Sequence, residues 1–188
     1  MKKSPKYFLI VLFIACSQLL SQPSTNAQTF EKSDAVLNLG VGLGDVYLVP
    51  GATIWPGLNA SFEYGVYKLK KVGVFSVGGI LSWQHASAGY SNYDLAWNEI
   101  YFGARAAFHL SILEVDNLDV YGGVTLGFRS YGSTDWDPHT QRDVVTRHFD
   151  PFPGVFVGGR WYFTPNFGVF SELGYEVSWF KAGISIKF

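Results

Sequence analysis

The sequence has little of what disulfide-rich, thiolate-dependent or helical membrane proteins require. Of its 188 residues only Cys16 is a cysteine, and charged residues make up 15%. A single cysteine cannot form a disulfide within the chain or supply a set of thiolate ligands for a metal. No segment offers about 20 continuous apolar residues, which excludes a protein that crosses a membrane with helices.

Residues 1–27 have the layout of a secretory signal peptide. Three lysines precede the uncharged run at 7–16, and a polar segment then ends in small residues at Ala27. The run is shorter than the roughly 18 residues of a spanning helix, so we expect it to be removed and 28–188 to remain. The alternative is lipoprotein processing at Cys16, although Phe13 stands where such signals usually have leucine.

The expected mature chain is a single acidic domain. Three of the 14 Lys and Arg residues and none of the 15 Asp and Glu residues lie in 1–27, so residues 28–188 carry a net charge of −4. This length suits one domain, and the acidic balance gives no reason to expect nucleic acid as a partner.

Glycine and aromatic residues are abundant, and apolar residues alternate with polar ones. The chain has 21 glycines and 18% aromatic residues, where ordinary proteins have about 7% glycine. Alternation over about 9 to 11 residues is typical of membrane-spanning strands. We count eight such runs: 35–44, 57–67, 73–84, 98–108, 118–130, 153–163, 167–176 and 179–188.

The two faces of these runs differ in charge. One face is uncharged throughout, as in the last run, where Ala182, Ile184, Ile186 and Phe188 share a side. The opposite face carries glycines and the charged residues Glu63, Glu99, Arg105, Arg129, Arg160, Glu172 and Lys181.

Two kinds of barrel fit this pattern. A soluble, lipocalin-like barrel would turn the apolar face inward around a ligand, and a membrane barrel would turn it outward. Glycine on the charged face favours the membrane barrel, because it leaves room for large side chains in a narrow interior. Aromatic residues gather in two belts, as bilayer interfaces favour. The belts are Phe75, Phe108, Phe163, Phe167 and Phe188 at one end, and Trp83, Trp97, Phe128, Tyr175 and Trp179 at the other.

The connections between runs alternate in length. Those at 68–71, 109–117 and 164–166 are shorter, whereas those at 45–56, 85–97 and 131–152 are longer, with a tight turn at 177–178. Short turns in the periplasm and longer loops outside are typical of outer-membrane barrels. The sequence therefore predicts an all-β, eight-stranded, antiparallel up-and-down transmembrane β-barrel with both ends in the periplasm.

These features resemble a known family. The expected signal peptide, the eight runs and the terminal Phe resemble small outer-membrane β-barrels of the OmpX and OmpA-membrane-domain type. The stretches "GGRWYFTPNFGVFSELGY" and "KAGISIKF" are similar to the closing hairpins of such proteins in Bacteroidetes-type bacteria. Lys181, Gly183, Ile186 and Phe188 match the family's C-terminal insertion signal. The resemblance implies location in the bacterial outer membrane and transient binding to the outer-membrane assembly machinery.

No constellation of catalytic, cofactor-binding or metal-binding residues stands out. Barrel enzymes that act on lipids pair His with Ser on the outward wall, and the outward Ser171 has no such partner. The 131–152 loop contains acidic residues and histidines, but their spacing fits no defined calcium loop and reads more simply as a salt-bridged surface. We therefore expect no enzyme, no cofactor and no metal.

Aromatic residues in the outer loops are candidates for contact with a surface ligand or partner. They either bind such a partner or pack the loops and touch lipopolysaccharide, and the second reading is favoured. The candidates are Tyr47, Trp55, Tyr90, Tyr93 and Trp136.

The charged face leads to the functional hypothesis. An eight-stranded barrel is only wide enough to be filled by side chains, and four cations would face three anions in it. We expect a closed lumen and a monomer with a structural or surface-interaction role that contacts lipid and lipopolysaccharide. The alternative is a narrow, gated channel or a transporter of small, apolar molecules.

Overall fold

The computed structural model describes most of the chain after residue 29. The described ranges are 30–44, 53–90, 93–112, 115–137 and 142–188. Side chains are described throughout these ranges except at 88–90, 93–96, 133–137 and 142–146. The described ranges contain no helix that is long and apolar enough to span a bilayer.

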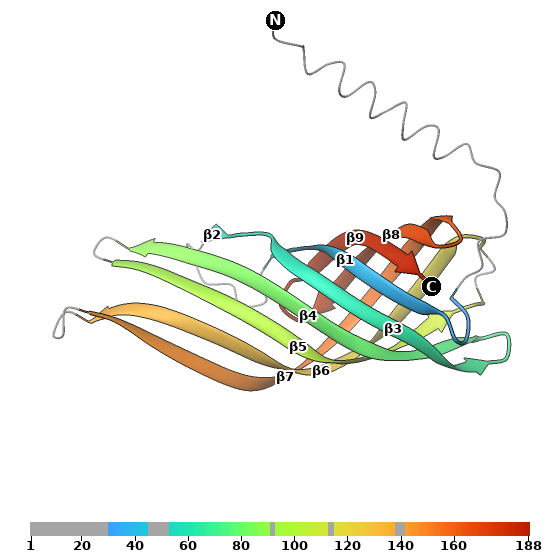
Figure 1. Ribbon diagram of the computed structural model, residues 1–188, viewed down its shortest axis with the longest axis horizontal. Coiled ribbons are helices and arrows are strands. Elements are labelled where there is room, and N and C mark those ends of the chain that lie inside the picture. Colours follow the sequence, from blue (N-terminus) through green and yellow to red (C-terminus); the bar gives the residue numbers. More distant parts are fainter. Residues whose placement is uncertain (1–29, 45–52, 91–92, 113–114, 138–141) are drawn as a thin grey trace, which may run out of the picture.

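Eight long strands form a closed antiparallel ring (Figure 1). Neighbours along the chain pair with each other, and the ring is closed by the pairing of β4 with β5 and of β1 with β9. The strands are β1 Ala35–Leu43, β3 Gly57–Leu69, β4 Gly73–Tyr90, β5 Tyr93–Leu110, β6 Leu118–Asp137, β7 Arg142–Thr164, β8 Phe167–Tyr175 and β9 Phe180–Lys187. The predicted eight-stranded up-and-down barrel is confirmed.

A ninth, two-residue strand lies in line with β3. This strand, β2 Thr53–Ile54, pairs with Ser87 and Ala86 of β4, beyond the point where the pairing of β3 with β4 ends at Trp83. It adds no member to the ring, because it continues the β3 position along β4.

The predicted alternation separates the inward and outward faces. In β5, Tyr101, Arg105 and His109 are buried, whereas Ile100 and Phe102 are exposed. The outward residues of all eight strands form the apolar wall, so the ring buries its charged residues and exposes its apolar ones. Because water-soluble proteins arrange these residues in the opposite way, the fold needs an apolar environment around its wall.

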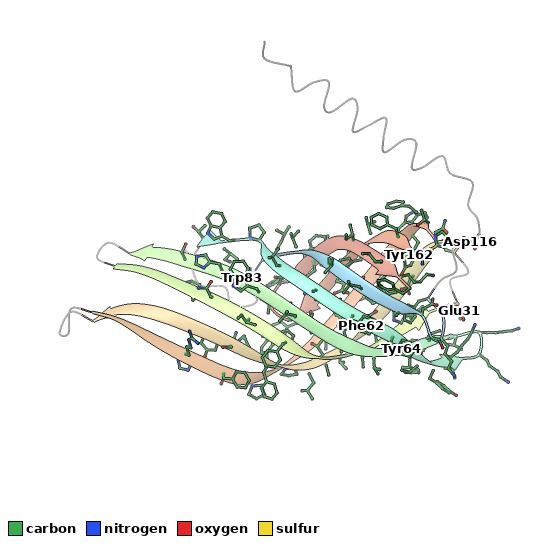
Figure 2. The ribbon with its side chains drawn as sticks, viewed as in Figure 1. Glu31, Phe62, Tyr64, Trp83, Asp116 and Tyr162 are labelled. Carbon is green, nitrogen blue, oxygen red and sulfur yellow. The ribbon has the colours of Figure 1, made fainter. Side chains whose placement is uncertain are left out.

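The aromatic belts also follow the strands, with one correction. Figure 2 shows Trp83 toward one end of the barrel and Tyr64 toward the end that carries Glu31 and Asp116. Trp97 was assigned to the outward belt, but it pairs with the buried Ala86 and lies on the inward face. The assignment was wrong because Trp97 has the same parity as Glu99 and Arg105, which point inward.

We call the two ends of the barrel the terminal end and the hairpin end. The terminal end holds both chain ends of the barrel and the turns after β3, β5 and β7. At the hairpin end, pairing of β4 with β5 continues to Tyr90 and Tyr93, and pairing of β6 with β7 continues to Asp137 and Arg142. Four strands therefore extend past the ends of the other four (Figure 1).

This extension corrects the predicted loops. Most of 85–97 and of 131–152 is strand, because the ladder continues in register after the apolar alternation stops. We call these extensions, 85–98 and 130–150, the projecting hairpins. At roughly 3.3 Å per strand residue, the first extends about 20 Å beyond the belt and the second about 26–30 Å.

Two prolines explain why β8 does not extend with β7. Pairing of β7 with β8 ends at Val155 and Tyr175, and the next residues of β7 on the same parity are Pro153 and Pro151. Proline has no N–H to donate to a neighbouring strand, so a longer β8 would lack ladder bonds at these positions. The chain instead turns inward after Tyr175, and Glu176, Val177 and Ser178 are buried.

The terminal end is closed by the first described residues and by the last. Phe30 is 1% exposed, and Ser33 and Asp34 exchange backbone hydrogen bonds with Gly65 of β3. The amide of Phe188 donates to the carbonyl of Ala35 at 2.8 Å, which continues the seam between β9 and β1 to the last residue.

Candidate functional site in the barrel lumen

Arg105 of β5 lies at the centre of the lumen, between carboxylates from opposite sides of the barrel. Its Nε donates to Glu63 Oε1 at 2.6 Å, and its Nη1 donates to Glu172 Oε2 at 3.2 Å. A second bond joins Nη2 to Glu172 Oε1, so the pair is bidentate. The guanidinium also stacks on the Phe156 ring, with 3.5 Å between Cζ and the ring centroid. Arg105 thus ties β3, β7 and β8 to β5 across the interior.

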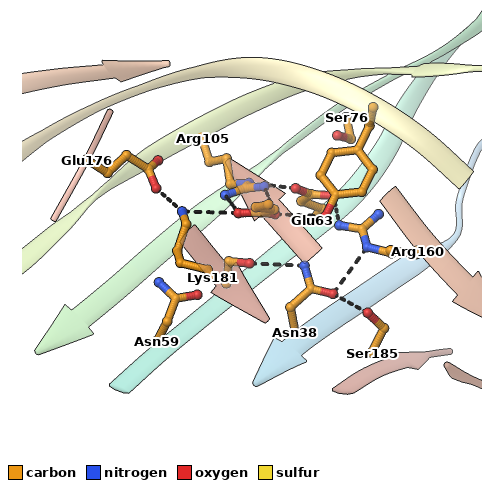
Figure 3. A network of polar contacts seen from close by, with 12 residues as sticks. Asn38, Asn59, Glu63, Ser76, Arg105, Arg160, Glu176, Lys181 and Ser185 are labelled. Carbon is orange, nitrogen blue, oxygen red and sulfur yellow. Dashed lines mark hydrogen bonds and ion pairs between the residues drawn. The ribbon is translucent and has the colours of Figure 1, made fainter. Parts of the chain in front are cut away.

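Arg160 of β7 repeats this arrangement nearer the terminal end. Its Nη1 donates to Asp119 Oδ2 at 2.8 Å, its Nη2 bonds to Glu63, and its Nε donates to Asn38 Oδ1 at 3.2 Å. Glu63 therefore accepts from both arginines, as Figure 3 shows. The side chains of Arg105, Arg160 and Glu63 are fully buried, so each charge depends on its partners rather than on water.

Lys181 of β9 closes the network toward the hairpin end. Its Nζ lies 3.1 Å from Glu172 Oε2 and also bonds to Glu176 in the inward turn (Figure 3). Tyr121 donates to Glu172 Oε1 at 2.8 Å. The inward turn is held further by Val177, which packs with Ile80 and Tyr101, and by Ser178, which donates to Gln84.

Glycines provide the space that this network occupies. A Cβ added at Gly158 would lie 2.7 Å from Cγ of Glu172 and 3.0 Å from Cζ of Tyr121. A Cβ at Gly40 would lie 2.8 Å from Cζ of Phe170. Contacts shorter than 3.0 Å are essentially never made by a real Cβ, so a side chain at either glycine would force the facing lumen side chains to move.

A second polar cluster lies at the terminal end. Ser76 Oγ is 2.9 Å from Nε2 of His109, and Nδ1 of His109 is 2.9 Å from Asp119 Oδ1. The Phe30 ring lies flat on the imidazole, with 3.8 Å between centroids and 16° between planes. This segment is tied down by ion pairs from Glu31 to Lys68 and from Asp34 to Lys187.

The Ser76, His109 and Asp119 cluster has the connectivity of a hydrolase triad but not the access. All three side chains are about 1% exposed, and the Phe30 ring covers the imidazole. A catalytic serine needs space beside Oγ for the scissile bond and donors for the oxyanion. Asp119 is also bonded to Arg160, so these residues form part of the lumen network.

A looser layer lies above the inward turn. Arg129 Nε is 3.6 Å from Glu99 Oε1, and the guanidinium lies over the rings of Tyr131 and Phe152. Tyr131 stacks on His148 across β6 and β7, with 5.0 Å between centroids. This layer begins the inward face of the projecting hairpins.

All seven lumen residues named from the sequence lie on the inward face, but they form two groups. Glu63, Arg105, Arg160, Glu172 and Lys181 meet in one network, whereas Glu99 and Arg129 form the separate layer. The aromatic residues that fill the space around these charges, Tyr101, Tyr121, Phe156, Tyr162 and Phe170, are all buried.

Sequence reasoning missed three members of the interior. Asp119 and Glu176 supply anions, and His109 was assigned to a connection although it lies in β5. Each has inward parity within or next to its run: His109 follows Arg105 and Ala107, Asp119 precedes Tyr121, and Glu176 follows Glu172. These three residues could have been identified by extending the inward–outward alternation to the ends of the runs.

The residues of the C-terminal motif divide between the two faces. Lys181 and Gly183 point into the lumen, whereas Ile186 faces outward and Phe188 is exposed. Of the candidate loop contacts, Trp55 is exposed beside β2. Tyr47 and the side chains of Tyr90, Tyr93 and Trp136 lie outside the described residues.

Comparisons with known proteins bear on the architecture. No family model matches the sequence, and no curated protein is detectably similar to it. Among solved structures, Ail of Yersinia pestis in complex with a heparin analogue is 13% identical, with a TM-score of 0.50, over 84% of this chain and 100% of that one. The N-terminal barrel domain of OprF from Pseudomonas aeruginosa is 14% identical, with a TM-score of 0.45, over 84% of this chain and 98% of that one. At such identities the likeness to Ail shows the fold, the small outer-membrane type of barrel.

Proposed function

We propose that this chain is an integral outer-membrane barrel with a closed lumen, which acts through its hairpin end at the cell surface. The observation that carries this proposal is the buried ion-pair network of Arg105 and Arg160 with Glu63, Glu172 and Asp119. Its members come from β3, β5, β6, β7 and β8, so their side chains meet across the lumen, which supports an interior filled by side chains.

The outward wall supports the membrane location. Among the described residues of the ring its members are apolar except Ser171, and a surface of this kind is stable only against lipid or another apolar partner. The terminal end then lies in the periplasm, because an even number of strands puts both ends of the barrel on the side of the short turns.

Planar-bilayer recordings test the closed lumen. The refolded protein is expected to show no steady conductance, because ions would have to pass Arg105 and Arg160. A steady current that is abolished by Glu172→Gln or Arg129→Gln would overturn the closed lumen and favour the gated channel. Heat-modifiable migration on a detergent gel is the first control, since a membrane barrel migrates differently before and after boiling.

The hairpin end also has features suited to lipopolysaccharide. Phe102, Phe128 and Phe149 form an outward ring cluster, with 5.0 Å between the centroids of Phe128 and Phe149. Arg147 is exposed one outward position beyond Phe149. Aromatic rings at the outer interface suit the boundary of the acyl chains, and a cation just beyond them suits a lipid phosphate. Loss of lipopolysaccharide binding in Arg147→Gln, measured with the refolded barrel in detergent, would support this contact, and unchanged binding would count against it.

The last residues are proposed as the signal for the assembly machinery. Phe188 completes the pairing of β9 with β1 and remains exposed, so a partner could read it before the seam closes. Deleting Phe188 is expected to lower the amount of assembled barrel in the outer membrane more than Phe188→Tyr does. Equal assembly of the deletion variant and the wild type would refute this role.

A further inference from the structure

The rim of the terminal end carries its charges unevenly. Lysines gather at the turn between β3 and β4 and on the adjacent first segment, whereas the turn before β6 presents Asp116 and the turn before β8 presents Pro165 and Asn166. We call the cluster at the first turn the lysine patch. Its members are Lys32, Lys68, Lys70 and Lys71.

The patch has much more positive than negative charge. All four lysines are exposed, and Lys68 pairs with Glu31 at 2.5 Å. In the part of the chain that the structure describes, Lys32, Lys70 and Lys71 make no ion pair. Three ammonium groups on one short stretch of rim are therefore available to an anionic partner.

A β-bulge positions the patch. The register of β3 with β4 shifts between Gly65 and Tyr67, which reverses the parity of the remaining strand. Tyr67 and Leu69 consequently face outward, while Lys68 is directed to Glu31 beside the mouth of the lumen. Lys71 adopts a positive φ of 58° in the turn that follows. Without the bulge, Lys68 and Lys70 would face outward, and Tyr67 and Leu69 would face the lumen.

The position of the lysine patch relative to the bilayer indicates its partner. Tyr67 is 57% exposed, and Leu69, Val72 and Phe75 are exposed beside it on the outward face. Such residues lie at the boundary of the hydrocarbon and the headgroups, and Lys70 is only about 10 Å further along the chain. Lysine side chains at this level reach the phosphate layer.

We propose that the lysine patch is a binding site for the phosphate groups of anionic phospholipids in the inner leaflet of the outer membrane. The inference rests on the proposed membrane location. Asp116 lies at the same end of the barrel (Figure 2), in the next turn around the rim, and disfavours such lipids there, so bound anionic lipid is concentrated at the turn between β3 and β4. Each lysine near an anionic surface contributes roughly a five-fold factor in affinity.

The test measures lipid retention by the intact barrel. Wild type and the double variant Lys70→Gln with Lys71→Gln are refolded into nanodiscs of zwitterionic lipid with a minor fraction of phosphatidylglycerol or cardiolipin. Bound lipids are counted by native mass spectrometry after release. The variant is expected to hold anionic lipid about 25-fold more weakly than wild type, and zwitterionic lipid equally well. The double variant Lys70→Arg with Lys71→Arg is the matched control, since it keeps both positive charges at the same positions and is expected to retain the anionic lipid.

The outcomes separate this site from the membrane proposal. If both proteins are heat-modifiable barrels and retain anionic lipid equally, the lysine patch is not a lipid site while the membrane location stands. If neither is heat-modifiable, the membrane location fails and the inference fails with it. Lysine-dependent sedimentation with isolated peptidoglycan, without lysine-dependent lipid retention, would assign the patch to cell-wall carboxylates and overturn the proposal. Loss of the wild-type preference at high salt is expected, because phosphate contacts by exposed lysines are screened.

Discussion

In the middle of the barrel, Arg105 and Arg160 are each bonded to two carboxylates, and neither guanidinium is exposed. In the projecting hairpins, Arg147 and His148 are exposed, and at the base of these hairpins the ion pair of Arg129 with Glu99 is wider, at 3.6 Å. The middle is surrounded by eight strands, whereas only four strands and the short β2 continue past it. Charge in the closed ring therefore holds the barrel together, while the exposed Arg147 of the projecting hairpins is accessible to a partner.

The largest expected loss of stability comes from changing Glu63, the carboxylate that two arginines share in the middle of the barrel. Glu63→Gln removes the negative charge that Arg105 and Arg160 share and leaves two buried cations undercompensated, so it should lower the free energy of unfolding by about 3–5 kcal/mol. Urea unfolding in lipid vesicles, followed by tryptophan fluorescence, measures the change.

Glu99→Gln is the matched variant in the looser layer. Because its pair with Arg129 is longer and less buried, we expect a loss of about 1 kcal/mol. Equal losses in the two variants would contradict the distinction between the lumen network and the hairpin layer.

The next effect concerns access to the terminal end. Phe30→Ala removes the ring that covers His109, and a Phe to Ala change at a packed position costs about 3 kcal/mol. Diethyl pyrocarbonate should then modify His109, which is protected in the wild type, while the exposed His148 reacts in both proteins. Phe167→Ala on the outward wall is the control. Continued protection of His109 in Phe30→Ala would show that another group closes this mouth.

A smaller effect is expected where β7 leaves the ring. Replacing Pro151 and Pro153 by valine restores two N–H donors on the side of β7 that β8 does not cover. The double variant should self-associate more than the wild type in cross-linking and sedimentation experiments. An unchanged monomer would indicate that the prolines do not protect this edge.

The smallest effect is a spectroscopic one and distinguishes the two faces directly. In single-tryptophan variants, brominated lipids should quench Trp83, which is outward, and should leave Trp97 largely unquenched, since it pairs with the buried Ala86. Equal quenching of the two indoles would show that the inward assignment of Trp97 is wrong.

The sequence alone predicted the number of strands, their antiparallel order and the inward face of the seven charges named for the lumen. It could do so because side chains alternate strictly along a strand, and because an apolar outward wall requires every charge to lie on the other face. The five charges of the lumen network that were named, from Glu63 to Lys181, follow from this alternation alone.

Only the tertiary structure decided which charges meet and where the barrel is closed. Arg160 bonds to Glu63 and Asp119 because strands far apart in sequence face each other across the lumen, and no local pattern encodes that distance. Phe30 and the inward turn at Glu176–Ser178 close the interior from outside the regular strands, so alternation could not reveal them. The projecting hairpins likewise extend by backbone pairing, which continues after the apolar pattern that predicts strands has ended.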